Sequence, residues 1–335
     1  MTYPRFFLGF CIYSLTTLVV LSAALLWWGA SEFTKSGPLK EPVIVEIQPG
    51  SGLRGISAQL TETGAIENPY IFIFGTRILG AQSDLKAGEY EFAPGMSARD
   101  IMVQLKDGKT IARRFTIREG LTSFEIVNII KDVEELEGEI AALPKEGALL
   151  PETYDYKRGE TREAVIARLQ QAMTTTIDAL WETRTANLPF STKEEALTLA
   201  SIVEKETGVA EERKRVAGVF INRLRRGIAL QTDPTVIYAL TGGKPKNEGK
   251  GPLGRRLLSK DLEFDSPYNT YKYPGLPPGP IANPGRASIE AVLHPEEHDF
   301  IYFVADGSGG HVFAATLEEH NKNVAEWRKI RKKKK

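Results

Sequence analysis

The sequence predicts an α+β protein built from a single N-terminal transmembrane helix, a small α+β domain, and a mainly helical domain that carries a few β-strands. Three observations support this prediction. An uncharged apolar run opens the chain, strand-like and helix-like patterns then follow each other over residues 43–107, and helical periodicity dominates from residue 160 onward. The length of 335 residues fits about two folded domains.

The composition excludes several classes of protein. A hydrophobic share of 42% supplies enough apolar material for sizeable cores, which argues against a disordered chain. The 43 basic and 43 acidic side chains cancel, whereas a dedicated nucleic-acid binder usually carries a basic excess. Cys11 is the single cysteine, so no intramolecular disulfide can form.

The apolar run over residues 6–30 contains no charged side chain. About 20 such residues span a bilayer, and Trp27 and Trp28 stand where an interfacial aromatic anchor is expected. The alternative is a cleaved signal peptide, whose apolar region is shorter, at about 7–15 residues. Because the run continues past the small residues Ser22-Ala23-Ala24, we expect an uncleaved anchor.

The charges around this run favour one orientation by a small margin. Arg5 and the α-amino group precede it, while Lys35 and Lys40 follow it together with Glu32 and Glu41. The positive-inside rule then places the N-terminus in the cytoplasm. The rest of the chain would lie outside the cytoplasm, as in a single-pass protein of a bacterial inner membrane with a periplasmic body.

The patterns also divide the chain into parts. The basic C-terminal run reads as a solvated, disordered end, with contact to anionic lipid headgroups as the alternative. The predicted parts are a cytoplasmic end (1–5), an anchor (6–30), a linker (31–42), a small α+β domain (43–110), a larger domain (111–327) and a basic tail (328–335).

Local patterns predict the elements within the two domains. Alternation predicts strands over residues 43–47 and 87–92, and Ser97 with Asp100 resembles a capping box. The predicted helices cover residues 53–60, 70–79, 97–105, 124–130, 160–182, 191–207 and 211–226, and a hairpin covers 301–314. The Gly-, Lys- and Pro-rich residues 241–256 read as a mobile loop.

The helix expected to end at Thr207 offers a candidate catalytic acid. Leu199, Ile202 and Val203 define its buried face, and Glu206 falls about 60° from the centre of that face at about 100° per residue. Partial burial raises the pKa of a carboxyl group, which suits a general acid near neutral pH. The structural alternative is an ion pair with the nearby Arg213.

Two polar stretches, Gln231–Thr235 and Tyr268–Tyr271, combine amide, hydroxyl and aromatic groups. Such groups suit sugars, but Asn, Thr and Pro are also turn residues, and the two interpretations remain equally open. His294 and His298 are four apart, as zinc ligands can be. Pro295 interrupts the local geometry and no cysteine assists, so we expect no metal.

Six segments together carry a family resemblance. They are Ala200–Thr207, Val219–Leu224, Leu230–Tyr238, Tyr268–Tyr271, Gly275–Gly279 and Tyr302–Gly307. In order and content they resemble the endolytic murein transglycosylases of the MltG (YceG-like) family. The likeness extends over nearly the whole chain, including the single N-terminal anchor.

The resemblance implies cleavage of MurNAc–GlcNAc bonds within nascent peptidoglycan strands, without water. The products would be 1,6-anhydroMurNAc ends, and strand elongation would stop. Residues 43–110 resemble the family's LysM-like, peptidoglycan-binding subdomain. Cell-wall synthases are candidate partners, and the family implies neither a cofactor nor a nucleic-acid partner.

The resemblance also implies roles for individual residues. In related lytic transglycosylases the catalytic Glu is followed by Ser or Thr, which fits Glu206-Thr207 and not Glu204-Lys205. Glu206 would act first as acid and then as base. The candidates for positioning the substrate and stabilising charge are Asn222, Gln231, Thr232, Asp233, Tyr268, Asn269 and Tyr271.

Two alternatives stay open, and two departures from the family pattern stand out. Asp233 could be a second catalytic carboxylate of a muramidase-type hydrolase, or the chain could be a non-catalytic peptidoglycan-binding scaffold. Ala148 occupies a position where the family often has an aromatic residue, so a sugar-stacking contact could be lost. The loop 241–256 is longer than is usual in the family.

Overall fold

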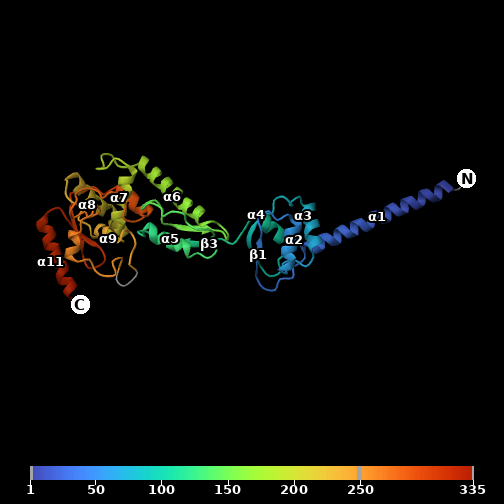
Figure 1. Cartoon of the computed structure of the whole chain (residues 1–335). Coiled ribbons are helices and arrows are strands. Elements are labelled where there is room, and N and C mark those ends of the chain that lie inside the picture. The colour runs from blue at the N-terminus through green and yellow to red at the C-terminus, as the bar shows by residue number, and fades with distance from the viewer. Residues whose placement is uncertain (1–2, 247–250, 334–335) are drawn as a thin grey trace. The chain divides into compact units, whose positions relative to one another are not determined.

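The computed structural model describes residues 3–246 and 251–333, and the chain divides into two compact units, Met1–Arg113 and Arg114–Lys335 (Figure 1). The first unit has one hydrophobic core and the second has two core clusters.

The first unit begins with the long helix α1 (Tyr3–Thr34). Its stretch Ile12–Thr34 is long and apolar enough to cross a bilayer. The helix continues through Ser31–Thr34, where the sequence predicted a linker, because after Gly29 the next helix-breaking residues are Gly37 and Pro38. Phe33 is buried in the core of the unit, so the end of α1 is fixed to the folded domain that follows.

An antiparallel pair of strands and three helices make up the rest of the first unit. Val45 and Tyr90 face each other across the strands, and both side chains are buried. Ser97 and Asp100 form the predicted capping box at the start of α4. The elements are β1 (Val43–Ile47), α2 (Leu53–Glu62), α3 (Pro69–Ile78), β2 (Gly88–Phe92) and α4 (Ala98–Asp107).

The second unit is mainly helical, with two small two-stranded sheets, β3–β4 and β5–β6. Its helices are α5 (Ser123–Lys131), α6 (Arg162–Glu182), α7 (Lys193–Glu206), α8 (Arg213–Arg225), α9 (Asp233–Thr241), α10 (Arg286–Leu293) and α11 (Leu317–Lys333). Its strands are β3 (Arg113–Thr116), β4 (Thr153–Tyr156), β5 (Tyr302–Ala305) and β6 (His311–Ala314), and its 3₁₀ turns are η1 (Ala210–Glu212) and η2 (Ser259–Glu263).

Helix α7 is central to the second unit, since α6, α8, α9 and α10 all contact it. Leu199, Ile202 and Val203 are fully buried, which confirms the apolar face predicted for this helix. The buried hydroxyl of Ser201 accepts a hydrogen bond of 3.0 Å from the amide of Ile281. This bond fastens the Pro-rich segment before α10 to the middle of α7.

The structure corrects one prediction about local order and adds a helix that the sequence did not predict. The basic run is not a disordered end, because residues 328–333 continue α11, whose first turn is capped by Thr316. The polar stretch at residue 231 is the start of α9, with Thr232 as its N-cap residue. In the predicted loop 241–256, Lys246 N–H donates to the carbonyl of Pro252, while residues 247–250 lie outside the described residues.

Candidate active site

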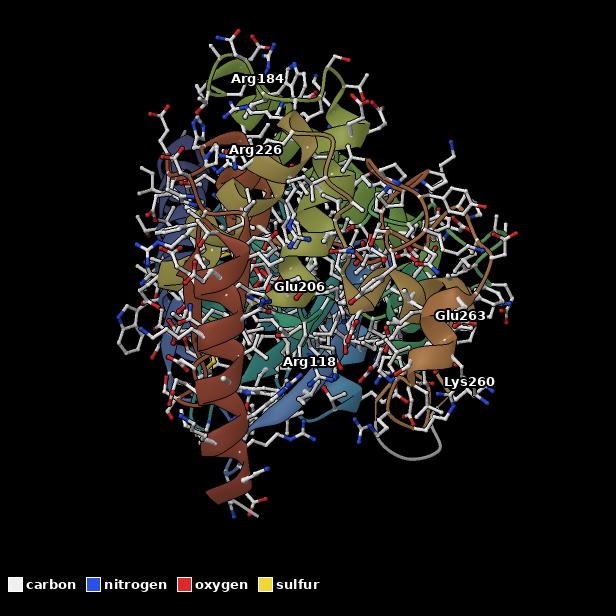
Figure 2. All side chains as sticks on the ribbon, turned by 90° about the vertical axis from the view of Figure 1, so that its left-hand side faces the viewer. Arg118, Arg184, Glu206, Arg226, Lys260 and Glu263 are labelled. Carbon is white, nitrogen blue, oxygen red and sulfur yellow. The ribbon has the colours of Figure 1, made fainter. Side chains whose placement is uncertain are left out.

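Glu206 is the last residue of α7, and its side chain is half-buried. A capping box of Thr192 and Glu195 fixes the start of this helix. Just after its end, the Thr207 hydroxyl accepts a hydrogen bond of 3.0 Å from the amide of Val209 and turns the chain away. Figure 2 shows Glu206 near the middle of the view, with Arg184 and Arg226 toward one end and Lys260 and Glu263 toward one side.

The surroundings of Glu206 favour its protonated form. Burial is the largest cause that raises the pKa of its carboxyl group, and the negative charge of Asp233 raises it further. The positive charge of Arg223 opposes this, as do His311 when it is protonated and the Thr232 hydroxyl, although that hydroxyl makes no hydrogen bond of standard length within the described part of the chain. The net pKa is raised, so Glu206 can retain a proton to donate.

The structural alternative for Glu206 was an ion pair with Arg213. Arg213 lies 4.0 Å from the carboxylate of Glu119 instead, and among the described residues no ion pair joins it to Glu206. The neighbouring Glu204 accepts a hydrogen bond of 2.9 Å from the amide of Gly285. Glu204 therefore holds the backbone before α10, while the Glu206 carboxyl lies close enough to Asp233 for the charge of Asp233 to act on it.

The two polar stretches meet beside Glu206. The phenol of Tyr271 donates a hydrogen bond of 2.7 Å to Asp233. The amide of Thr232 donates to the hydroxyl of Thr270 over 3.1 Å, and the amide of Gln231 donates to the carbonyl of Thr270 over 3.1 Å. These bonds join the beginning of α9 to the 268–271 segment.

Gln231 has an unusual backbone conformation for its residue type. Its φ is 53°, in the left-handed region that residues other than glycine seldom adopt, and its side chain is exposed. Backbone strain of this kind is often found at functional sites. Here it accompanies the sharp change of direction between the end of α8 and the start of α9, directly before Thr232 and Asp233.

Two other predicted site residues hold the backbone of loops. The amide group of Asn222 donates to the carbonyls of His298 (2.6 Å) and Phe300 (3.1 Å). Asn269 is fully buried, and its side-chain oxygen accepts a hydrogen bond of 3.0 Å from the amide of Tyr271. Asn269 thus fixes the segment that carries Tyr271, whereas Asn222 points to the loop before β5.

Tyr268 lies in a different place, at a cavity of about 740 Å³ beside the first half of α7. Its ring and that of Tyr238 have centroids 4.9 Å apart. Glu146 also lines this cavity, and burial raises the pKa of its carboxyl group. Ala148 lines it too, so the position at which the family often has an aromatic residue faces this space.

Arg223 was not among the residues predicted from the sequence. It is buried, donates to the carbonyls of Ile301 (2.7 Å) and Leu230 (2.8 Å), and contributes positive charge near Glu206. A signal was present, because Arg223 follows Val219 and Phe220 at helical spacing and so lies on the buried face of α8.

His311 on β6 was also not predicted. Its ring nitrogen Nδ1 lies 2.8 Å from Glu212, and its backbone amide donates to the same carboxylate over 2.9 Å. This pair attaches the β5–β6 hairpin to the turn that follows α7. It was hidden in the sequence because the two residues are far apart along the chain.

A half-buried carboxyl of raised pKa, close to a second carboxylate and held by tightly bonded loops, is typical of enzymes that use general acid–base catalysis. Residues 45–326 match the YceG-like family, and the chain belongs to that family.

Named relatives agree with this assignment. The chain is 34% identical over 314 residues to an endolytic murein transglycosylase of Bacillus subtilis, covering 84% of each chain. It is 32% identical over 336 residues to an endolytic murein transglycosylase of Streptococcus pneumoniae, covering 86% of this chain and 58% of that protein. A crystal structure of a yceG-like protein from Listeria monocytogenes matches 84% of the chain and 99% of its own, with 36% identity and a TM-score of 0.50.

Proposed function

We propose that the chain is a membrane-anchored endolytic transglycosylase that cleaves peptidoglycan strands, with Glu206 as its catalytic acid and base. The observation that carries this proposal is the placement of Glu206. Its carboxyl group ends a buried helix, has a raised pKa, and lies beside Asp233 without an ion pair to Arg213. Membership of the YceG-like family and relatives named endolytic murein transglycosylase support the choice of peptidoglycan.

The proposed reaction needs one carboxyl group and no water. Glu206 first donates its proton to the glycosidic oxygen between MurNAc and GlcNAc, and the C1–O bond breaks. The resulting carboxylate then takes the proton from the MurNAc 6-hydroxyl. The oxygen of that hydroxyl bonds to C1 at the same time, which gives a 1,6-anhydroMurNAc end. The N-acetyl group of the substrate stabilises the positive charge at C1, as in substrate-assisted glycosidases.

The other residues would position the strand. Thr232, Asp233, Tyr271 and the exposed Gln231 lie at the start of α9 and in the segment bonded to it, around the reacting sugar. Tyr268, whose ring is tilted against that of Tyr238, would contact a sugar farther along the strand.

Asn222 and Asn269 would act indirectly, through the loops that they hold. Residues 43–110 would form the LysM-like subdomain that binds peptidoglycan.

Glu206→Gln tests the assignment, with Glu211→Gln as the matched control because Glu211 is an exposed carboxyl on the following turn. Purified protein is incubated with uncross-linked glycan strands, and the products are identified by mass spectrometry. Loss of the general acid should slow cleavage by about 10²–10⁴-fold, while the control keeps its rate. A Glu206→Gln protein that cleaves normally would show that Glu206 is not the catalytic acid, and one that leaves strand length in cells unchanged would favour the scaffold alternative.

Asp233 lies near enough to Glu206 to be the second carboxylate of the hydrolase alternative, and the products of the reaction test this alternative. Its charge influences Glu206, as a second catalytic carboxylate would. A muramidase would use water and leave reducing MurNAc ends instead of anhydro ends. Products that carry only reducing ends would therefore replace the transglycosylase proposal with the hydrolase.

We place the protein as a single-pass protein of the bacterial inner membrane, with its N-terminus in the cytoplasm and its catalytic unit in the periplasm. The apolar part of α1, which lies largely within Ile12–Thr34, supplies the span. Protease should digest the second unit when it is added to spheroplasts. The same protease should leave this unit undigested when it is added to intact cells. Cross-linking from this unit would then show whether cell-wall synthases are partners.

A further inference from the structure

Helix α3 of the first unit exposes an apolar stripe. Tyr70, Phe74 and Ile78 are four residues apart and therefore lie on one side of the helix. They are 69%, 61% and 70% exposed, and Leu79 just beyond the helix is 53% exposed. Contiguous exposed apolar surface of this kind indicates an interaction site rather than an ordinary solvent-exposed surface.

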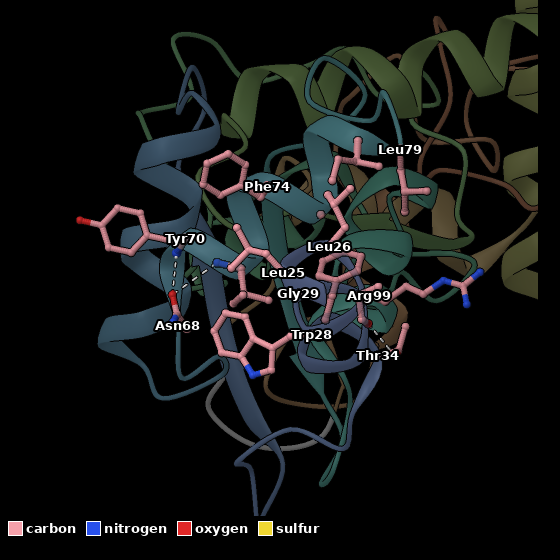
Figure 3. Close-up of a pocket in the computed structure, with 15 residues that line it drawn as sticks. Leu25, Leu26, Trp28, Gly29, Thr34, Asn68, Tyr70, Phe74, Leu79 and Arg99 are labelled. Carbon is pink, nitrogen blue, oxygen red and sulfur yellow. Dashed lines mark hydrogen bonds between the residues drawn. The ribbon is translucent and has the colours of Figure 1, made fainter. Parts of the chain in front are cut away.

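The stripe faces the end of α1. A cavity of about 540 Å³ opens between the two helices, lined by Leu25, Leu26 and Trp28 from α1 and by Phe74 and Leu79 from the α3 side (Figure 3). Ile78 lines it as well. The helices are held in this arrangement by a close contact farther along α1. The ring of Phe33 lies so near Gly75 that a Cβ there would come within 2.5 Å of it.

The part of α1 that lies beside the α3 stripe sets the depth of the stripe relative to a membrane. A span of about 20 apolar residues that ends at the interfacial pair Trp27-Trp28 places Leu25 and Leu26 at the edge of the acyl-chain region. Because α3 shares a cavity with these two leucines, its stripe lies at the same level. A membrane crossed by α1 therefore meets the stripe directly.

Cationic side chains flank the stripe. Arg99 lines the same cavity and Arg77 is exposed on α3 itself, and within the described part of the chain neither makes an ion pair. The nearby Lys35 is already engaged by Glu32 at 2.6 Å and Glu67 at 3.5 Å. Apolar side chains edged by arginines match a bilayer surface, where acyl chains lie below anionic headgroups.

We propose that the α3 stripe is inserted into the leaflet that α1 enters, with acyl chains against Phe74, Ile78 and Leu79 and anionic phospholipid headgroups at Arg77 and Arg99. This inference rests on the proposed membrane anchor. It makes α3 an in-plane amphipathic contact that holds the first unit against the bilayer, in addition to the span itself.

Fluorescent labels on the full-length chain test the depth of the stripe. In a Cys11→Ser background, Ile78→Cys is labelled with an environment-sensitive dye, with Leu21→Cys as the membrane reference and Ile44→Cys as the matched control. Ile44 is also exposed in the first unit, at 56%, but lies on β1. Each protein is reconstituted in phosphatidylcholine–phosphatidylglycerol vesicles that carry nitroxide-labelled acyl chains.

We expect the label at residue 78 to be blue-shifted and quenched almost as strongly as the label at residue 21, and several-fold more than the label at residue 44. Adding Phe74→Asp should reduce quenching at residue 78 several-fold, while circular dichroism reports an unchanged fold. Quenching at residue 21 but not at residue 78 would overturn this inference and leave the anchor intact. No quenching at either position would remove the anchor itself.

One further outcome would identify protein, and not lipid, as the partner that covers the α3 stripe. If a water-soluble quencher cannot reach the label at residue 78 and the lipid nitroxide does not quench it either, protein covers the stripe. In vesicles that contain only this chain, the cover would be a second copy, and the lipid assignment would be wrong.

Discussion

The phenol of Tyr271 donates a hydrogen bond of 2.7 Å to Oδ1 of Asp233, across a separation of 38 residues in the sequence. Burial and this carboxylate together raise the pKa of Tyr271, so the phenol remains a donor at physiological pH. The bond fixes Asp233 at the beginning of α9, from where its charge acts on Glu206. It therefore connects the 268–271 segment to the proposed catalytic carboxyl.

Tyr271→Phe should reduce kcat by about tenfold without changing the fold. A hydrogen bond to a charged group contributes about 1.5–3 kcal/mol, and a tenfold change corresponds to about 1.4 kcal/mol. Tyr273→Phe is the matched control, because it removes a bond of 2.8 Å from an exposed phenol to Asp265. Rates of anhydro-product formation compare the two variants, and equal losses would show that the bond has only a structural role.

Asp233→Asn should move the alkaline limb of the pH–rate profile to lower pH. The donating form of Glu206 is protonated, so the rate falls as pH rises through its pKa. The charge of Asp233 raises that pKa, and removing the charge lowers it. Initial rates measured across pH for the wild type, Asp233→Asn and the exposed control Asp265→Asn check this shift. A variant with no activity at any pH would instead support a direct catalytic role for Asp233.

The sequence revealed α7 well because its apolar residues recur at helical spacing, and Leu199, Ile202 and Val203 are indeed fully buried. The charged helix α11 has no such apolar pattern, which explains why residues 328–333 were read as disordered. Periodicity reports a helix only where one face is buried.

Side-chain roles at the site were harder to predict than the helix. Asn222 and Arg223 are adjacent on α8, but the charge of Arg223 acts on Glu206 while Asn222 points to the loop at His298. Asparagine is a residue type that often binds sugars, yet the amide nitrogen of Asn269 donates its hydrogen bonds to the carbonyls of Leu262 and Phe264. Asn222 bonds to a loop that is distant in the sequence, whereas Asn269 bonds within its own loop, and residue type alone does not specify either contact.

Glu206→Gln should stabilise the protein at neutral and alkaline pH while it removes activity. The pKa of Glu206 is raised above 4.5 by folding, so its charged form costs stability at pH values above the folded-state pKa. The cost declines as pH falls through that pKa and is absent below about 4.5, where the carboxyl is protonated in both states.

Thermal unfolding at several pH values checks this effect. The difference in Tm between Glu206→Gln and wild type should be positive at alkaline pH and vanish in acid, whereas Glu211→Gln should show no such trend. A destabilised Glu206→Gln protein at alkaline pH would mean that the carboxylate makes a favourable ion pair.

Tyr268→Leu should weaken substrate binding and leave the chemical step nearly unchanged. The ring lines the 740 Å³ cavity at the end of α7 remote from Glu206, so it can contact the strand but not the reacting bond. Leucine retains apolar packing and removes the aromatic face, which contributes about 0.5–1.5 kcal/mol in ring contacts. KM for glycan strands should rise a few-fold while kcat is maintained. A fall in kcat alone would place the ring at the reaction centre instead.

Asn283→Ala should strongly destabilise the second unit, because its fully buried side chain makes four hydrogen bonds. Its oxygen accepts from the amide of Leu149, and its nitrogen donates to Leu121, Ser123 and Glu146 over 3.0–3.1 Å. Each buried group left unsatisfied costs about 1–3 kcal/mol, so we expect a loss of about 3 kcal/mol or more.

Urea unfolding followed by tryptophan fluorescence, to which Trp181 of the second unit contributes, measures this loss, with the exposed Asn321→Ala on α11 as the control. Alanine is a better helix former than asparagine, so the control should be neutral or slightly stabilising. Similar midpoints for the two variants would show that water replaces the Asn283 amide without cost. In that case the Pro-rich segment before α10 would not depend on Asn283 for its position beside Glu146.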